Sequence, residues 1–252
     1  MQPTPQRTDP APSGQGHPPD GSPADGHEMA DHFSDLARSI HQETPDGILA
    51  IVVQAAINLI PGTDEASLSI VRGREKVDSQ APSSDLAKQL SALQMELGEG
   101  PCLDSIYEER TVRVPDMATE NRWPRFAQQA TDSGVGSMLA FQLYVEGDNL
   151  GALNLYSREA GAFTEESEHI GESLASHAAI ALADAQKLDQ LHQAVASRDV
   201  IGQAKGILME RHRVTSHQAF LLLAKASSHT NRKLLDIADD LVNTGEFTRT
   251  TN

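Results

Sequence analysis

The segment Arg198-Asp-Val-Ile-Gly-Gln-Ala-Lys-Gly-Ile-Leu-Met-Glu-Arg211 decides how the last quarter of this 252-residue chain folds. Its apolar residues recur at i, i+1, i+4, i+7 and i+8, the spacing of one stripe on an amphipathic helix. These residues are Val200, Ile201, Ala204, Ile207 and Leu208. Gly202 and Gly206 lie on another face. Because a glycine inside a helix costs about 1 kcal/mol, two of them indicate that something approaches that face closely.

Two more helices are predicted after this segment. Thr215 and Gln218 match the capping box that starts a helix. The third helix is expected to begin near Thr230 or Asn231, which are both favourable N-cap residues, and to stop at Gly245. Each helix has one apolar stripe, so the segment predicts an all-α three-helix bundle.

Basic side chains occupy many of the remaining positions in this bundle. They form either a surface that contacts phosphates or an ordinary solvated helix face, and the charges alone favour the solvated face. The residues are Lys205, Arg211, Arg213, Lys225, Arg232 and Lys233.

The same quarter of the chain carries four motifs in order: Val200-Ile-Gly-Gln-Ala-Lys-Gly-Ile-Leu-Met209, Ala219-Phe220, Thr230-Asn-Arg-Lys-Leu234 and Asp236-Ile-Ala238. In order and spacing they closely resemble the ANTAR domain, a family of bacterial RNA-binding domains that act in transcription antitermination. The resemblance implies a three-helix bundle fed by a coiled coil. It also implies binding, usually as a dimer, to paired hairpin loops of nascent transcripts. The sequence departs from the family at Arg213, where a glycine is common.

This resemblance turns the basic surface into an expected RNA-binding site. The predicted contacts are Lys205, Arg211, Lys225, Asn231, Arg232 and Lys233. The amide of Asn231 is expected to reach a base edge, because the bases of open loops are the readable part of RNA. The formal net charge is -16, yet from Arg198 onward eight basic residues outnumber six acidic ones. An acidic body would keep RNA away from everything except the C-terminal module.

The middle of the chain mixes helix and strand patterns. A helix is predicted from Ile48 to Leu59, before Pro61-Gly62, and a second one carries Leu86, Leu90 and Leu93. The predicted strands are Ala66–Val71, Thr111–Val114, Met138–Val145 and Leu150–Tyr156, with Glu146–Asn149 as a hairpin turn between the last two. These helices and strands predict an α+β domain over residues 44–183, with an antiparallel sheet flanked by helices.

Four motifs of this segment resemble the GAF domain: Leu97-Gly-Glu-Gly-Pro-Cys102, Val114-Pro-Asp116, the hairpin from Ala140 to Tyr156, and Phe163-Thr-Glu-Glu166. The resemblance implies a sensory domain that binds a small molecule or another protein. No motif selects among the family's ligands, so the cofactor is unknown.

The candidate ligand-binding residues of this domain are Gly100, Cys102, Asp104, Trp123 and Phe126. The loop from Gly98 to Cys102 is either a phosphate cradle or a tight strand-to-helix turn, and the turn is favoured because the Lys and Ser/Thr of a P-loop are missing. Cys102 is interpreted as a small buried residue in preference to a redox-sensing thiol of low pKa. Trp123 and Phe126 are interpreted as core more than as pocket walls. No catalytic or metal-ligand constellation is found, so the protein is not expected to be an enzyme.

A coiled coil is predicted between the two domains. Apolar and small residues recur in 4-3 steps: Leu174, Ala178, Ala181, Ala185, Leu188, His192 and Val195. The first half of this helix is expected to pack on its own sheet, and residues 184–197 form the coiled-coil linker. This series therefore predicts a homodimer whose two copies meet along residues 174–195.

The remaining features predict a cytoplasmic protein. The single Cys102 excludes an internal disulfide, and neither a signal peptide nor a span of ~20 apolar residues is found. Residues 1–28 are rich in Pro, Gly, Ser and Asp, so they are predicted to be disordered.

The predicted function is therefore that of a dimeric regulator. A GAF-like sensor alters a coiled coil that positions two ANTAR-like modules, residues 198–246, on RNA. One alternative is a DNA-binding regulator, because three helices with basic faces also describe helix-turn-helix domains. The other is an enzyme that acts on a small ligand in the middle domain.

Overall fold

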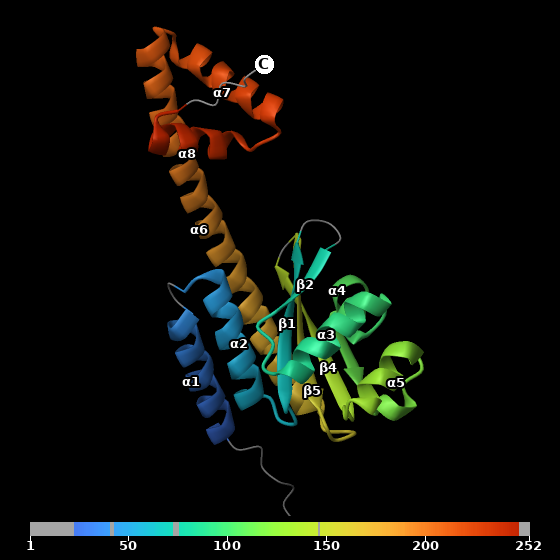
Figure 1. The fold of residues 1–252 in the computed structure, drawn as a ribbon. Helices are drawn as coiled ribbons and strands as arrows, with labels where there is room; N and C mark the ends of the chain where they lie inside the picture. Colours follow the sequence, from blue (N-terminus) through green and yellow to red (C-terminus); the bar gives the residue numbers. More distant parts are fainter. Residues whose placement is uncertain (1–22, 41–42, 73–75, 146, 247–252) are drawn as a thin grey trace, which may run out of the picture.

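A five-stranded antiparallel sheet lies at the centre of the N-terminal body (Figure 1). This computed structural model describes residues 23–40, 43–72, 76–145 and 147–246. The strand order is β2-β1-β5-β4-β3. The strands are β1 Glu65–Arg72, β2 Lys76–Gln80, β3 Thr111–Val114, β4 Ser137–Val145 and β5 Asp148–Ser157.

Helices cover both faces of this sheet (Figure 1). One layer comprises α1 (Pro23–Ile40), α2 (Pro45–Leu59) and the first half of α6 (Glu165–His212). The other comprises α3 (Asp85–Leu97), α4 (Pro101–Tyr107), the short 3-10 helix η1 (Met117–Thr119) and α5 (Pro124–Asp132). Because side chains alternate along a strand, Leu68 and Ile70 of β1 join the core with α2 and α6, whereas Ser67 faces α3.

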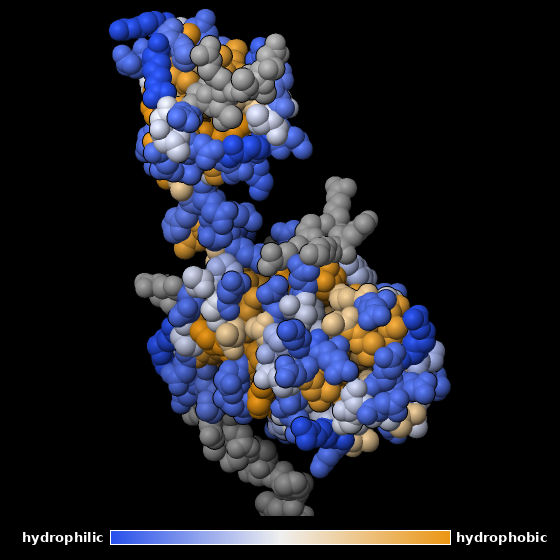
Figure 2. Space-filling view, in the orientation of Figure 1, coloured by the Kyte–Doolittle hydropathy of each residue, from blue (hydrophilic) through white to orange (hydrophobic). Residues whose placement is uncertain are grey.

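Helix α6 runs without interruption for 48 residues from the sheet to the C-terminal body. The Thr164 side chain accepts a hydrogen bond from the N–H of Ser167 and so caps its first turn, as predicted. Leu174 and Ala178 are buried against the sheet, whereas Leu188 and Leu191 lie exposed further along. Figure 2 shows this part of the molecule as a narrow neck between two bodies.

The C-terminal body is the predicted three-helix bundle. Helices α7 (Ser216–Thr230) and α8 (Leu234–Thr244) pack on the last turns of α6. The buried core contains Ala204, Leu208, Ala219, Leu223, Ile237, Ala238 and Leu241. The capping box of Thr215 and Gln218 is present at the start of α7. None of the helices in the described part of the chain combines the length and apolarity needed to cross a bilayer.

The structure contains elements that the sequence did not predict. The segment 1–28, predicted to be disordered, contains the start of α1 from Pro23 onward, while residues 1–22 lie outside the described residues. Leu36 and Ile40 of α1 are buried against α2 and α6, which explains why this polar segment folds. Strand β2 and helix α5 were also missed, because both are short and mostly polar. Of the predicted hairpin turn, Glu146 lies outside the described residues, and the flanking strands pair as expected.

Candidate functional site

A cluster of fully buried polar side chains lies between the sheet and the layer of α3 and α4. The cluster forms because several side chains of β1 and β5 that face these helices are polar. Its members are Ser67, Ser69, Ser91, Gln94, Cys102, Ser105, Asn154 and Tyr156, each exposed by 1% or less. Buried polar groups must find partners or carry a free-energy cost, so their pairing decides what this cluster can do.

One end of the cluster is fully paired. The hydroxyls of Ser67 and Ser91 lie 2.8 Å apart, and the Tyr156 hydroxyl lies 3.3 Å from each of them. Burial raises the pKa of the Tyr156 phenol far above its usual range, against the smaller effect of these two hydrogen bonds. This end of the cluster is therefore neutral and joins α3 to the sheet.

The other end is incompletely paired. The amide nitrogen of Asn154 donates to Cys102 Sγ and to Ser69 Oγ, each at 3.3 Å, and Gln94 Oε1 accepts from the Cys102 N–H at 2.8 Å. Asn154 Oδ1 and Gln94 Nε2 are buried without a hydrogen-bond partner. An unsatisfied buried group costs about 1–3 kcal/mol, so this end of the cluster carries one unmet acceptor and one unmet donor.

Cys102 is the buried residue that the sequence predicted. Burial raises the pKa of its thiol, and hydrogen bonds to Ser69 and Asn154 offset this only in part. The possibility of a lowered pKa at a helix N-terminus is therefore wrong for this thiol.

The glycine-rich loop joins α3 to α4, so the prediction of a strand-to-helix turn is wrong. Gly98 ends α3 in the left-handed conformation. Gly100 has φ +138°, and a Cβ there would lie 2.4 Å from Gln94 Oε1. The Glu99 carboxylate accepts from the N–H groups of Arg125 and Phe126 and so caps α5. The backbone of this loop thus serves packing and capping, and the Cys102 N–H that a phosphate cradle would use is already bound to Gln94.

The five candidate ligand residues take part in two separate sets of contacts. Gly100 and Cys102 border the buried polar cluster through Gln94 and Asn154. Trp123 Nε1 instead donates to the Asp104 carboxylate at 3.0 Å.

No side-chain hydrogen bond joins Asp104, Trp123 or Phe126 to Gln94 or Asn154 in the described part of the chain. Burial, and then repulsion from Glu108, raises the pKa of the Asp104 carboxyl. Trp123 and Phe126 are buried in the hydrophobic core beside α5, as the core interpretation predicted. The sequence missed Gln94 and Asn154, because a polar residue in a helix or strand pattern gives no sign that it is buried.

The six predicted RNA contacts differ in how free their side chains are. Arg211 donates to the carbonyl of Gly245, and Arg232 forms a 2.7 Å ion pair with Asp240. Among the described residues, Lys205, Lys225 and Lys233 have no ion-pair partner. The three lysines are therefore the better candidates for phosphate contacts.

Asn231 does not cap the third helix. It ends α7 in the left-handed conformation at φ +52°, and α8 begins only at Leu234, after Lys233. Asn tolerates this conformation better than most residues do, which explains its place in the turn. Its side chain is exposed and contacts solvent.

Arg213 lies in the turn where the ANTAR family commonly has glycine. It ends α6 with φ +54°, a left-handed conformation that favours glycine. The turn therefore keeps the shape that a glycine would give it, with strain at Arg213.

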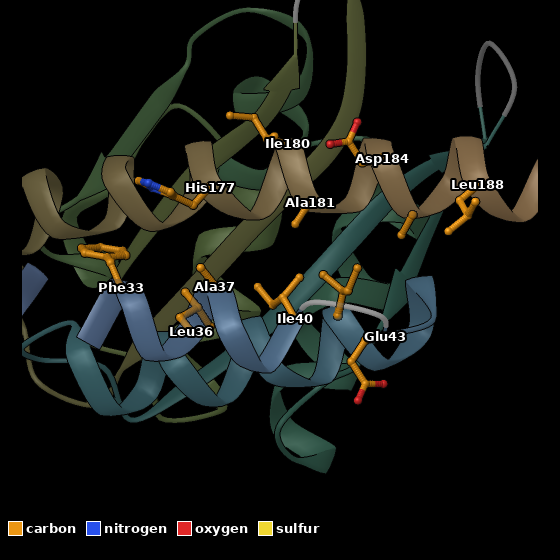
Figure 3. Close-up of a pocket in the computed structure, with 12 residues that line it drawn as sticks. Phe33, Leu36, Ala37, Ile40, Glu43, His177, Ile180, Ala181, Asp184 and Leu188 are labelled. Carbon is orange, nitrogen blue, oxygen red and sulfur yellow. The ribbon is translucent and has the colours of Figure 1, made fainter. Parts of the chain in front are cut away.

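An apolar pocket of about 430 Å³ lies between α1 and α6 (Figure 3). Leu36 and Ile40 of α1 face Ala181 and Leu188 of α6 across it. The Phe33 ring stacks on His177 with 5.2 Å between ring centroids. The sequence did not predict this pocket, because α1 was not predicted.

Comparison with known families and structures covers most of the chain. The model of the GAF domain family matches residues 42–183, and that of the ANTAR domain matches residues 189–242. No curated protein matches the chain.

Two solved structures are similar to the chain in fold. The GAF domain of a phosphoenolpyruvate-protein phosphotransferase from Coxiella burnetii has a TM-score of 0.53 and 21% identity, over 65% of this chain and 98% of that one. The photosensory core module of the Stigmatella aurantiaca phytochrome has a TM-score of 0.57 and 12% identity, over 82% of this chain and 45% of that one. At these identities the likeness shows the fold alone.

Proposed function

Because the chain belongs to the GAF domain family and carries an ANTAR domain after its GAF domain, we propose that it is a dimeric antitermination regulator. Residues 44–183 sense a signal, residues 184–197 link the two copies, and residues 198–246 bind hairpin loops of nascent transcripts. The observation that carries this proposal is α6, one unbroken helix that belongs to the cores of both bodies. The proposed chemistry is binding.

The proposed RNA site consists of lysines whose charges are not paired with a described acidic side chain. Lys225 and Lys233 are exposed and Lys205 is half-buried, and no ion pair joins these three to another described residue. The whole chain carries a net charge of -16, so a polyanion is repelled by most of its surface. Phosphates are therefore expected to approach the C-terminal body at these lysines.

In the proposed dimer, the two copies meet along the neck of α6, which is residues 184–197. Leu188, Leu191 and Val195 are 53%, 60% and 54% exposed. Large apolar side chains in a row on one helix indicate a partner surface, and a second copy of the same helix offers the matching stripe. Leu188 also lines the pocket between α1 and α6, so this apolar surface continues onto the sensor body (Figure 3).

We propose that the signal is a small polar molecule that binds in the buried polar cluster. The unpartnered Gln94 Nε2 and Asn154 Oδ1 supply one donor and one acceptor for it. Gln94 belongs to α3 and Asn154 to the central strand β5, so a molecule bound to both would tighten the packing of that helix on the sheet.

The RNA function is tested by fluorescence anisotropy with hairpin RNAs and duplex DNA in the same salt. Changing Lys205, Lys225 and Lys233 to Gln should weaken RNA binding and lower the salt slope by roughly 2–3. A control with Lys88, Arg125 and Arg158 changed to Gln removes the same charge from the sensor body and should leave RNA affinity nearly unchanged. Preference for duplex DNA, or an unchanged affinity in the lysine variant, would contradict the proposal.

A further inference from the structure

Two grooves of opposite charge flank α6 where it enters the ANTAR bundle. The groove on the α8 side is lined by Asp236, Asp239 and Asp240. The groove on the α7 side has a volume of about 420 Å³, and its polar and aromatic walls come from Arg198, Lys205 and Phe220. A polyanion is repelled by the first groove and attracted to the second.

We propose that the α7-side groove, lined by Arg198, Ile201, Gly202, Lys205 and Phe220, holds one unpaired base of the RNA loop. The base stacks on the Phe220 ring, and Arg198 and Lys205 contact the phosphates on either side of it. The inference rests on the proposed RNA-binding function and names the part of the RNA that this surface reads. Neither Arg198 nor Phe220 is among the contacts predicted from charge and motif.

The exposure of Phe220 supports a stacking role. Its side chain is 40% exposed, whereas Phe126, Phe141 and Phe163 are all buried. Aromatic faces are the surfaces on which proteins stack unpaired bases. The cations beside the ring are available as well, because no side-chain hydrogen bond or ion pair joins Arg198 or Lys205 to another described residue.

Gly202 supports the close approach of a ligand. A Cβ at this position would meet no atom within 4 Å, so packing inside the chain does not require a glycine there. A helix-interior glycine lowers helix stability relative to alanine. In the groove, its missing side chain leaves room for the edge of a flat ring next to Phe220.

The experiment uses the full chain and a pool of RNA hairpins with a fixed stem and a randomised loop. Phe220→Ala should weaken binding by about 5- to 150-fold, the range for loss of one stacked base, and Phe220→Tyr should restore most of it. The matched control is Leu221→Ala, which truncates the neighbouring side chain, 52% exposed but outside the groove. It should leave affinity unchanged.

Two further readouts separate stacking from charge and from folding. Arg198→Gln should lower the salt slope by roughly 1, whereas Phe220→Ala should leave that slope unchanged. Gly202→Ala should raise the melting temperature and still weaken RNA binding. Gly206→Ala, at a second open glycine outside the groove, should raise the melting temperature without that loss.

The outcomes distinguish a failure of the proposed RNA-binding function from a failure of the groove assignment. If the wild type does not bind the pool, the proposed function fails, and this inference fails with it. If the wild type binds and Phe220→Ala behaves like Leu221→Ala, only the groove assignment is overturned. A changed sedimentation coefficient in Phe220→Ala without RNA would make the groove a protein interface, which also overturns it.

Discussion

At the scale of single residues, burial sets the chemistry of Cys102. Because its pKa is higher in the folded than in the unfolded chain, ionisation favours unfolding. The stability it contributes is present below about pH 8.5, and it falls by up to about 1.4 kcal/mol per pH unit above that value. Denaturant unfolding between pH 7 and 10 should show this loss, and Cys102→Ser should reduce it.

The same burial predicts an unreactive thiol. The thiolate is the nucleophile, so Cys102 should resist iodoacetamide at pH 8 in the folded protein and react quickly in denaturant. RNA affinity under reducing conditions should be nearly the same in Cys102→Ser. Fast alkylation of the folded protein, or a large loss of RNA affinity, would mean that this residue has a role in the signal.

A third residue-scale prediction concerns the strained turn at Arg213. Its exposed ion pair with Glu210 spans 3.8 Å and contributes little, whereas its left-handed backbone costs about 1–2 kcal/mol. Arg213→Gly should therefore stabilise the bundle by about 0.5–1 kcal/mol after the entropy cost of glycine. Asn231→Gly is the matched control, with a smaller gain because Asn tolerates φ +52°. Thermal unfolding that shows Arg213→Gly less stable than the wild type would contradict this account.

At the scale of elements, the exposed stripe of α6 predicts how two copies meet. Replacing Leu188 and Val195 with Asp would bury charge in the seam of a dimer, at a cost of several kcal/mol. Sedimentation at micromolar concentration should then show a dimer for the wild type and a monomer for the variant. Lys187→Asp is the control, because it introduces one acidic residue outside the 4-3 series. A monomeric wild type would rule out the coiled-coil dimer.

At the scale of the whole molecule, α6 connects the two bodies of the described chain along the neck (Figures 1 and 2). Gln190 is exposed and belongs to neither core. Gln190→Pro breaks the helix at a local cost of ~3 kcal/mol or more, yet both bodies should stay folded. Proteolysis should then cut the neck, and hairpin affinity should fall because the two RNA modules lose their common geometry. Gln190→Ala should behave like the wild type, and unfolding of the bundle in Gln190→Pro would show that the bodies are not independent.

Local patterns in the sequence determined most of the elements and their order. The 3.6-residue period from Val200 to Leu208, the capping box at Thr215 and the alternation from Met138 to Val145 depend on neighbours three or four positions away, or two along a strand. Those interactions are the same in any tertiary setting. The three-helix bundle, the antiparallel sheet and the long helix could therefore be predicted before the fold was known.

Only the tertiary structure decided which side chains are available. Arg232 is paired with Asp240, Arg211 is bound to the Gly245 carbonyl, and Gln94 and Asn154 are buried with unmet hydrogen bonds. Helix α1 likewise folds on contacts with α2 and α6. The physical reason is that burial and pairing arise between residues far apart in the chain, whereas periodicity reports only on which face of its own element a residue lies.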